Sequence, residues 1–408
     1  MPRPDARGRS CRTPLPVRTA FRSRGSLQAV APISRLQFAL PMPSLPVIPT
    51  SSYTLDPRIP TLVPGFDAPF FQAGLAGYSD GAMRLIARRH GCPYCVTEAL
   101  LDQTLINGGK GRRREDPNLL AQGCGSGTQN DNQAAGQSDH PLAGQIIGTE
   151  PEEMGEGAAI LVKMGYEVID VNLACPVKKL RRKSRGGHFL AQPEEALAVL
   201  RAVREAVPEE IPTTVKLRRA FDDSPEMTRN FEQIFEGVYE LGYGWATVHC
   251  RTVQQKYEGP GRWDFLTNLT RRYPDRLIFG SGDIWIAPDI FRMIEETGVH
   301  AVAVARGCIG NPWIFRQARQ LLEGDPVEEI MQGPSVPEQR EVLHEHFQLS
   351  ARLHSEGGAG RMMRKFGIKF SHHHPQPEVV KAEFVRCKSM ADWQGVLERH
   401  YQNGDHHP

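Results

Sequence analysis

The stretch Val168-Ile169-Asp170-Val171-Asn172-Leu173-Ala174-Cys175-Pro176 decides the fold class of this chain. It has the pattern of a short apolar strand that ends in an asparagine and a cysteine, and a basic loop closed by glycines follows at 178–187. A cysteine at the carboxyl end of a strand is held by rigid backbone and faces a pocket, where barrel enzymes carry their chemistry. A buried cysteine followed by a solvated charge run is the alternative. The neighbouring segments favour the first interpretation.

The composition is that of a globular protein. The chain has 408 residues, of which 40% are hydrophobic, enough for one large and one smaller domain. No apolar run reaches the roughly 18 residues of a membrane span, so none is expected. The eight cysteines are scattered, which favours a reducing compartment and a cytoplasmic location. The net charge is only +2, so nucleic-acid binding would depend on local basic patches such as 178–185.

Residues 1–60 are expected to form a disordered or loosely ordered extension. Residues 1–55 are rich in proline, serine and arginine, contain one acid, Asp5, and have no sustained apolar periodicity. The arginine-rich character resembles a transit peptide, without a clear signal-peptide pattern. The other interpretation is that Met42 is the true first residue and that 1–41 are not translated.

In residues 61–325, strand-like and helix-like segments alternate, which predicts a (β/α)8 TIM barrel. The expected strands are 69–73, 94–97, 142–147, 168–172, 213–217, 245–249, 277–280 and 301–304. The expected helices between them include 79–90, 151–164, 193–205, 225–240 and 287–297. An open doubly wound sheet competes, but Gly74-Leu75-Ala76-Gly77 lacks the spacing of a dinucleotide fingerprint.

Two further segments stand apart from the barrel pattern. Residues 123–141, rich in Gly, Gln, Asn, Ser and Asp, are expected to be a flexible insertion. Residues 335–405 contain only helical patterns, at 336–354, 359–371, 377–387 and 391–402, and predict a small helical domain.

Polar side chains recur at the carboxyl ends of the expected strands, and in a barrel these ends converge on one pocket. Glycine-bearing turns after the seventh and eighth strands let backbone N–H groups approach a phosphate, and Arg306 adds a charge-assisted contact. Lys216 and Gln145 can donate hydrogen bonds to an isoalloxazine ring, where a cation stabilises the reduced flavin. Each residue alone is more typical of a solvated strand end, but the ordered set predicts an FMN site.

A series of motifs occurs in a fixed order between roughly residues 70 and 386. They are Ala73-Gly-Leu-Ala-Gly-Tyr-Ser-Asp80, Thr97-Glu98, Asp170-Val-Asn-Leu-Ala-Cys-Pro176 with Lys178 and Gly186-Gly187, Val215-Lys-Leu-Arg218, His249-Cys-Arg-Thr252, Gly280-Ser-Gly-Asp283 and Ala305-Arg-Gly-Cys-Ile-Gly-Asn-Pro-Trp313. In this set the chain resembles the tRNA-dihydrouridine synthase family. The resemblance implies an FMN-bearing barrel and a helical domain that grip tRNA, with NADPH as reductant, and reduction of the C5=C6 bond of specific uridines to 5,6-dihydrouridine.

The resemblance also implies a role for each site residue. The flavin would deliver a hydride to C6 while Cys175 protonates C5, which needs a neutral thiol or a route for its reprotonation. Asn172 would hold the base. The implied cofactor contacts are Gly74, Leu75, Ala76, Gln145, Lys216, His249, Ser281, Gly282, Asp283, Ala305 and Arg306. At some positions the chain departs from the usual family residue, namely Gly74-Leu75 for Pro-Met, Ala174 for Gly, Ser281 for Asn and Ala305 for Gly.

Basic residues are the expected tRNA contacts. The loop at 178–185 would position RNA phosphates around the pocket, because a target base must be flipped out of the tRNA fold to reach the flavin. Arg361, Arg364 and Lys365 fall at helical spacing and are expected to face RNA, although a solvated face has the same pattern. The full set is Lys178, Lys179, Arg181, Arg182, Lys183, Arg185, Arg251, Arg361, Arg364 and Lys365.

No metal site is expected. His372-His373-His374 lacks a helical His-x3-His pair with a carboxylate, and Cys92-Pro-Tyr-Cys95 lacks the second pair that zinc needs. No membrane and no obligate protein partner are implied.

Two other classes of function stay open. A barrel flavoenzyme for a small molecule, such as a dihydroorotate-type dehydrogenase, would share the FMN site but needs neither the basic loop nor the helical domain. A non-catalytic RNA-binding relative would not need Cys175, Asn172 and Lys216 together. The uridine position, the choice between NADPH and NADH, and the oligomeric state are not readable from the sequence.

Overall fold

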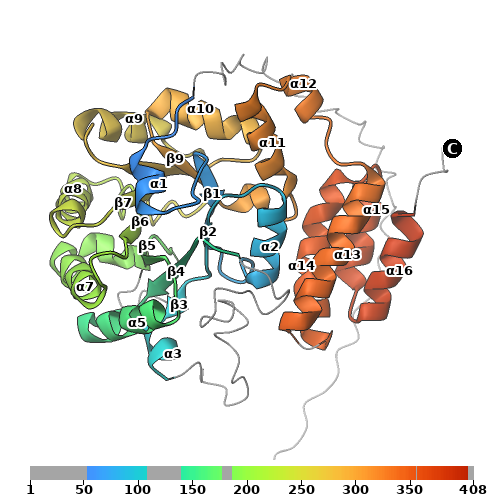
Figure 1. The fold of residues 1–408 in the computed structure, drawn as a ribbon, viewed down its shortest axis with the longest axis horizontal. Coiled ribbons are helices and arrows are strands. Elements are labelled where there is room, and N and C mark those ends of the chain that lie inside the picture. Colours follow the sequence, from blue (N-terminus) through green and yellow to red (C-terminus); the bar gives the residue numbers. More distant parts are fainter. Residues whose placement is uncertain (1–52, 108–138, 177–185, 355, 403–408) are drawn as a thin grey trace, which may run out of the picture. The chain divides into compact units, whose positions relative to one another are not determined.

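Eight parallel strands close into a barrel in the computed structural model, which describes residues 53–107, 139–176, 186–354 and 356–402 (Figure 1). Around the ring they are β1 (Phe70–Gln72), β2 (Cys95–Val96), β4 (Leu142–Ile147), β5 (Val168–Leu173), β6 (Thr213–Arg218), β7 (Trp245–His249), β8 (Ile278–Ser281) and β9 (Ala301–Val304). The pairs β2–β4 and β1–β9 complete the ring, and β3 (Leu100–Leu101) pairs with β4 at its rim. The predicted TIM barrel is confirmed, and an open doubly wound sheet is excluded.

Helices surround the barrel between successive strands (Figure 1). They are α2 (Gly81–Arg89), α3 (Asp102–Ile106), α5 (Pro151–Lys163), α7 (Pro193–Ala206), α8 (Pro225–Glu240), α9 (Trp263–Arg272), α10 (Ala287–Thr297) and α11 (Trp313–Glu323). Several begin with proline at the first helical position, where its missing N–H costs no hydrogen bond. The sequence analysis did not identify α9 and α11, because neither begins with a capping side chain or with a proline at the first helical position.

Stacked aromatic rings fill the amino-terminal half of the barrel. Phe66 stacks on Tyr94 with ring centroids 4.7 Å apart, and Trp245 stacks on Phe279 at 4.9 Å. All four side chains are buried, as is Ile59 of α1 (Arg58–Leu62). Because this half of the interior is packed with apolar rings, polar side chains gather at the opposite, carboxyl ends of the strands.

The expected boundaries of two segments need correction. Residues 53–60, which we assigned to the loose extension, belong to the folded barrel unit: Ile59 is buried and the Tyr53 hydroxyl donates to the carbonyl of His300 at 3.0 Å. Of the insertion expected at 123–141, residues 123–138 lie outside the described residues. Asp139 is buried and forms an ion pair with Arg84 at 2.8 Å, so the end of this segment is an anchor of the fold.

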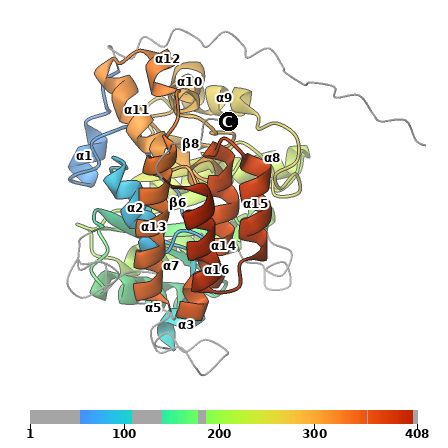
Figure 2. The ribbon, with the colours of Figure 1, turned by 90° about the vertical axis from the view of Figure 1, so that its right-hand side faces the viewer.

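In the described residues, the short helix α12 (Val327–Ile330) and then four longer helices follow the barrel, and the four lie close to the expected segments. They are α13 (Val336–Leu353), α14 (Glu356–Phe370), α15 (Pro377–Arg386) and α16 (Met390–His400), and Figure 2 shows them alongside one another. Phe347 and Phe384 pack around Trp393 in their shared core, and α13 contacts α2 of the barrel. Within the described ranges, no helix combines the length and the apolar composition that crossing a membrane requires.

A close approach at Gly310 joins the barrel to α14. Gly310 has φ +71°, and a Cβ there would lie 2.6 Å from Cβ of Lys369 and 2.8 Å from the backbone N of Phe370. Gly324 has φ +91° with nothing within 4 Å of a built Cβ. We predict that Gly324→Ala costs about 1–2 kcal/mol of unfolding free energy, from its positive φ alone.

Gly310→Ala is expected to lower the free energy of unfolding by clearly more than Gly324→Ala does. The reason is that a clash with α14 adds to the penalty of the positive φ. Thermal unfolding of the two variants beside the parent measures the difference. Equal losses of Tm for the two variants would contradict the close packing of α14 on this loop.

Candidate active site

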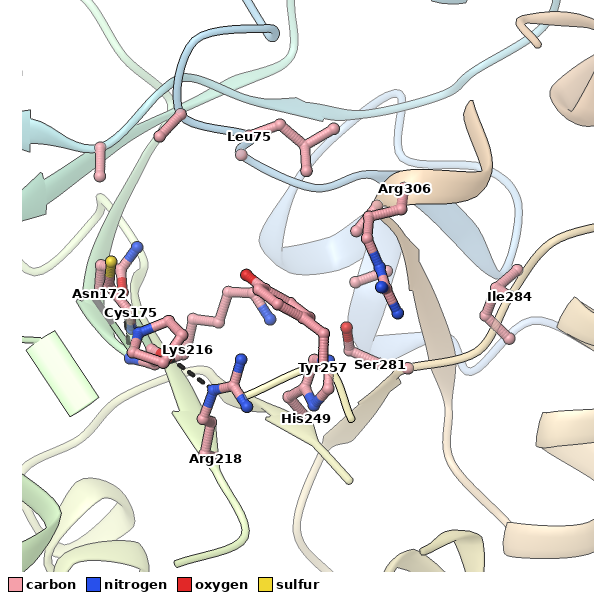
Figure 3. A pocket seen from close by; sticks show the side chains of 18 of the residues that line it. Leu75, Asn172, Cys175, Lys216, Arg218, His249, Tyr257, Ser281, Ile284 and Arg306 are labelled. Atoms are coloured by element: carbon pink, nitrogen blue, oxygen red, sulfur yellow. Dashed lines mark hydrogen bonds between the residues drawn. The ribbon is translucent and has the colours of Figure 1, made fainter. Parts of the chain in front are cut away.

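A cavity lies at the carboxyl ends of the barrel strands (Figure 3). Every residue predicted to contact a cofactor lines it, and so do both predicted catalytic residues. These residues are Gly74, Leu75, Ala76, Gln145, Asn172, Cys175, Lys216, His249, Ser281, Gly282, Asp283, Ala305 and Arg306. Figure 3 shows Asn172 and Cys175 on one side of the cavity and Ser281 and Arg306 on the opposite side. The barrel thus brings together in one place residues that are far apart in the sequence.

A chain of buried hydrogen bonds crosses β4, β5 and β6 beneath the cavity. The Asp170 carboxylate accepts from Thr214 Oγ1 at 2.6 Å and from Gln145 Nε2 at 2.7 Å. The Gln145 side-chain oxygen in turn accepts from Asn172 Nδ2 at 2.7 Å. Burial raises the pKa of Asp170, while the bonds from Thr214 and Gln145 oppose that shift. Each link fixes the rotamer of the next, so this network orients Asn172.

The Asn172 side chain holds the backbone of the segment that carries Cys175. Its Oδ1 accepts from the backbone N–H groups of Ala174 at 3.0 Å and Cys175 at 3.1 Å. The carbonyl of Ala174 accepts from Arg218 Nε at 2.8 Å, and the carbonyl of Cys175 accepts from the N–H of Gly187 at 3.1 Å. The predicted role of Asn172 was to hold a base, whereas its oxygen is here engaged by the cysteine loop.

Two polar atoms in the cavity wall are buried without a hydrogen-bond partner among the described residues. They are Nζ of Lys216 and Oγ of Ser281. Burial and the nearby Arg218 lower the pKa of Lys216 to about 8, while Asp170 opposes the shift. Buried polar groups are normally hydrogen-bonded, so unpartnered ones that line a cavity indicate a polar ligand.

The surroundings of His249 favour the neutral ring and one of its two tautomers. Burial, together with the cations Lys216 and Arg218, lowers the pKa of His249 well below its usual value. Its Nδ1 accepts from the backbone N–H of Arg251 at 3.2 Å. Since a neutral imidazole has one N–H, the proton is placed on Nε2, which can donate to a ligand in the cavity.

The prediction that Arg251 contacts RNA is not supported. Its side chain is only 3% exposed, and its guanidinium donates to both oxygens of Asp283 at 2.6 and 2.7 Å. The same group donates to the carbonyl of Gly259. Arg251 therefore stabilises the turn after β8 from within, and an RNA strand outside the cavity would not reach it.

Two aromatic residues that sequence reasoning missed stand at the mouth of the cavity. Tyr257 is 52% exposed and Trp285 is 49% exposed, both unusual for large rings. The Arg306 guanidinium lies 4.7 Å from the ring centroid of Tyr257 and 4.8 Å from that of Trp285. Nothing in the spacing of these rings identifies them, because only the folded turns bring them to Arg306.

A second, larger cavity adjoins the first and shares Trp285 and Arg306 with it. It lies between the turn after β9 and the end of α14, and its charged lining includes Lys369 and Lys381 with one acid, Glu378. The mouth of the first cavity thus continues into a mainly basic hollow.

The predicted RNA contacts other than Arg251 divide into three groups. Lys178, Lys179, Arg181, Arg182, Lys183 and Arg185 lie outside the described residues. Arg361 and Arg364 are exposed on α14, as expected. Lys365 is half-buried, its ammonium donates to the carbonyl of Gly77, and it lies 4.8 Å from the ring centroid of Tyr78. The expectation that Lys365 faces RNA is therefore corrected, because its charge is turned toward the barrel.

The paired cysteines lie away from the cavity. The sulfur atoms of Cys92 and Cys95 are buried and 3.8 Å apart. In the part of the chain that the structure describes, no group of three or more His, Cys, Asp or Glu side chains is placed to hold a metal ion.

A TIM barrel with a cation-rich cavity at the carboxyl ends of its strands is the class of protein that this structure defines. The model of the family described as dihydrouridine synthase (Dus) matches residues 71–404. This chain belongs to the dihydrouridine synthase family.

The chain is also similar to individual members. It is 28% identical to a probable tRNA-dihydrouridine synthase of Treponema pallidum, covering 80% of this chain and 91% of that protein. It is 29% identical to the tRNA-dihydrouridine synthase B of Shewanella oneidensis, covering 81% and 94%. The corresponding protein of Pasteurella multocida is 32% identical over 54% of this chain and 64% of its own length.

Lys216 generates a prediction about stability. In flavin-free protein, Lys216→Met removes a buried charge without a partner, and we expect Tm to rise by about 2 °C, or about 1 kcal/mol. The folded pKa of about 8 lies below the usual 10.5, so the unfolded state binds more protons between these values. The penalty of the charged lysine is therefore complete below pH 8, and the advantage of the variant should shrink as the pH rises through 8 toward 10.

Thermal unfolding of the parent and Lys216→Met from pH 6 to 10 checks this, with the exposed Lys163→Met as the control that should show no such trend. A variant that is less stable than the parent at pH 6 would show that Lys216 is not a strained charge.

Proposed function

We propose that this protein is a tRNA-dihydrouridine synthase that binds FMN in the cavity at the strand ends and reduces specific uridines of tRNA with NADPH as reductant. The observation that carries the proposal is that the half-buried Cys175 lines the same cavity as the unpartnered Lys216 and Ser281, within a chain of the dihydrouridine synthase family. The product is 5,6-dihydrouridine. We also propose a cytoplasmic location, where tRNA, the proposed substrate, is present.

The lining residues fit FMN. Lys216, Gln145 and the Nε2–H of neutral His249 are hydrogen-bond donors on the inner wall and would hold the polar edge of the isoalloxazine ring. Ser281 Oγ and Arg306 would hold the phosphate on the opposite wall. When bound, FMN supplies the hydride that C6 of the uracil receives.

Glycines allow the backbone to approach such a group closely. A Cβ at Gly74 would lie 2.3 Å from the carbonyl oxygen of Thr97, so this position has no room for a side chain on its packed side. Gly282 has φ +124°, and a Cβ there would lie 2.5 Å from the sulfur of Cys250. Both residues line the cavity, and a side chain at either position would clash with the atoms packed behind the wall, so the cavity keeps its shape only with glycine there.

Cys175 would donate the proton that C5 of the uracil takes up. General-acid catalysis requires the donor to be held within hydrogen-bond reach of the accepting atom. The Asn172 side-chain oxygen accepts from the backbone N–H of Cys175, and Arg218 and the Gly187 N–H donate to the carbonyls of Ala174 and Cys175; these bonds supply that rigidity. Lys216 and Arg218 add positive charge beside the reacting ring, which favours electron-rich states of a flavin or a uracil.

Surface features around the mouth support tRNA as the substrate. The rings of Tyr257 and Trp285 are both exposed and both lie next to Arg306, and exposed rings beside a cation suit stacking with bases. Arg361 and Arg364 on α14 and the basic hollow beside the mouth would contact phosphates. The loop at 178–185 remains a proposed contact of the same kind.

The Cys175→Ala variant separates the two half-reactions. We expect anaerobic bleaching of the flavin by NADPH to proceed as in the parent, because the thiol is not needed for that step. Reoxidation by unmodified tRNA should slow by about 10²–10⁴-fold, because the proton donor to C5 is lost. Stopped-flow absorbance of the flavin band measures both rates.

Cys387→Ala, which removes a buried thiol far from the cavity lining, is the matched control and should leave both rates unchanged. Equal tRNA reoxidation by Cys175→Ala and parent would remove the proton-donor assignment. If a small pyrimidine restores the parent flavin and tRNA does not, with no dihydrouridine in the RNA digest, the proposed substrate is wrong.

A further inference from the structure

We propose that Lys365 of α14 is a positioning residue for the flavin site: it holds the loop at 74–80 from behind, so the helical domain is a structural part of that site. The inference rests on the proposed function and goes beyond it, because it gives a residue expected on an RNA-binding face a role in cofactor binding. The argument begins at the loop itself.

The front of this loop forms part of the cavity wall. Gly74, Leu75 and Ala76 line the cavity, where the proposed FMN would contact them. The loop is a tight turn in which the Leu75 N–H donates to the Ser79 hydroxyl at 2.8 Å, and the Ser79 N–H donates to the Leu75 carbonyl at 3.0 Å. Its position therefore decides the width of the cavity on this side.

The peptide groups of Gly77 are held from two domains. The Gly77 N–H donates to the Glu98 carboxylate of the barrel at 2.6 Å, and the Gly77 carbonyl accepts from the Lys365 ammonium of α14. Burial raises the pKa of Glu98, and the Gly77 N–H and the charge of Lys365 oppose that shift. The loop is thus fixed between a carboxylate on one side and a cation on the other.

Aromatic packing and a second polar contact support the same attachment. The Lys365 ammonium lies 4.8 Å from the ring centroid of Tyr78, and that ring packs edge-to-face on Phe366 of α14 at 5.7 Å. At the end of the loop, the buried Asp80 carboxylate lies 2.9 Å from Nε2 of His354, the residue that follows α13. Contacts from the helical domain therefore extend over the rear of the loop.

Helix α14 presents its other side to solvent. Arg361 and Arg364 are exposed there, while Lys365 is half-buried. An RNA strand that binds these arginines contacts the same helix that holds the flavin loop. Removal of the Lys365 charge should therefore weaken mainly the binding of the cofactor. Removal of the Arg364 charge should weaken mainly the binding of RNA.

The test compares Lys365→Met with Arg364→Met in the full-length, FMN-bound protein. For Lys365→Met we expect FMN affinity to fall about tenfold, the loss that one charge-assisted hydrogen bond would cause, with a shifted flavin absorption band. Its affinity for unmodified tRNA, measured with saturating FMN, should stay close to that of the parent.

For Arg364→Met we expect the reverse: the flavin spectrum and the FMN affinity should be unchanged, and tRNA binding should be weaker. FMN release on dilution, followed by fluorescence, and tRNA filter binding give the two affinities.

Lys365→Arg should restore most of the FMN affinity, because a cation can again reach the Gly77 carbonyl. If Lys365→Met is too unstable to purify, Lys365→Gln, which keeps a neutral donor, replaces it with an expected intermediate loss.

If a Lys365 variant keeps the parent flavin spectrum and FMN affinity but binds tRNA weakly, Lys365 is an RNA ligand and the inference is overturned. A parent protein that binds no FMN would instead overturn the proposed function itself, so the two failures are distinguishable.

Discussion

A single buried carboxylate governs the geometry of the candidate active site. Asp170 lies inside the barrel, where an unpartnered charge would be costly, and the hydrogen bonds that satisfy it come from Gln145 and Thr214 on the two neighbouring strands. In the sheet register Gln145 lies beside Asp170, and Asp170 lies beside Thr214. The need to satisfy this carboxylate therefore ties the pairing of β4, β5 and β6 to the side chains above them. From Gln145 the constraint continues through Asn172 to the backbone of Cys175.

The same region contains buried positive charges whose electrostatic environment is unfavourable. Lys216 and Arg218 are neighbours on β6, and burial depresses the pKa of both. A chain selected for stability alone would not leave an ammonium group without a partner inside a barrel. An anionic or carbonyl-rich ligand would relieve that strain. Stability and ligand binding are therefore coupled in this cavity. The buried lysine without a partner lowers the stability of the fold, and a bound ligand would restore it.

The strands and most of the helices can be predicted from the local pattern of apolar and polar residues. The set of residues at the strand ends can be predicted in the same way. The strands β4, β7 and β9 coincide with the expected ranges because each is a short, mainly apolar run. The order of strands in a TIM barrel then requires their carboxyl ends to converge, so a set of residues far apart in sequence could be predicted as one site. Helices that begin with neither a capping side chain nor a proline, such as α9, carry no comparable signal.

Burial of charged side chains could not be predicted in this way. Arg251 and Lys365 have the same chemistry as exposed basic residues, and only tertiary contacts with Asp283 and with Gly77 distinguish them. Tyr257 and Trp285 likewise acquire meaning from the turns that bring them to Arg306. In each case the decisive partner is distant in sequence, and neither spacing nor composition reports on such a contact.

The aromatic rings that fill the amino-terminal half of the barrel have a kinetic consequence. Phe66, Tyr94, Trp245 and Phe279 are packed together and buried, and the cavity is lined by residues at the carboxyl ends of the strands, so we expect ligands to enter from that end. A reductant and an RNA nucleotide would then have to use the same entrance to the cavity. The two molecules would then bind in turn, and the oxidised reductant would leave before the nucleotide binds. Each molecule would therefore be a competitive inhibitor of the binding of the other.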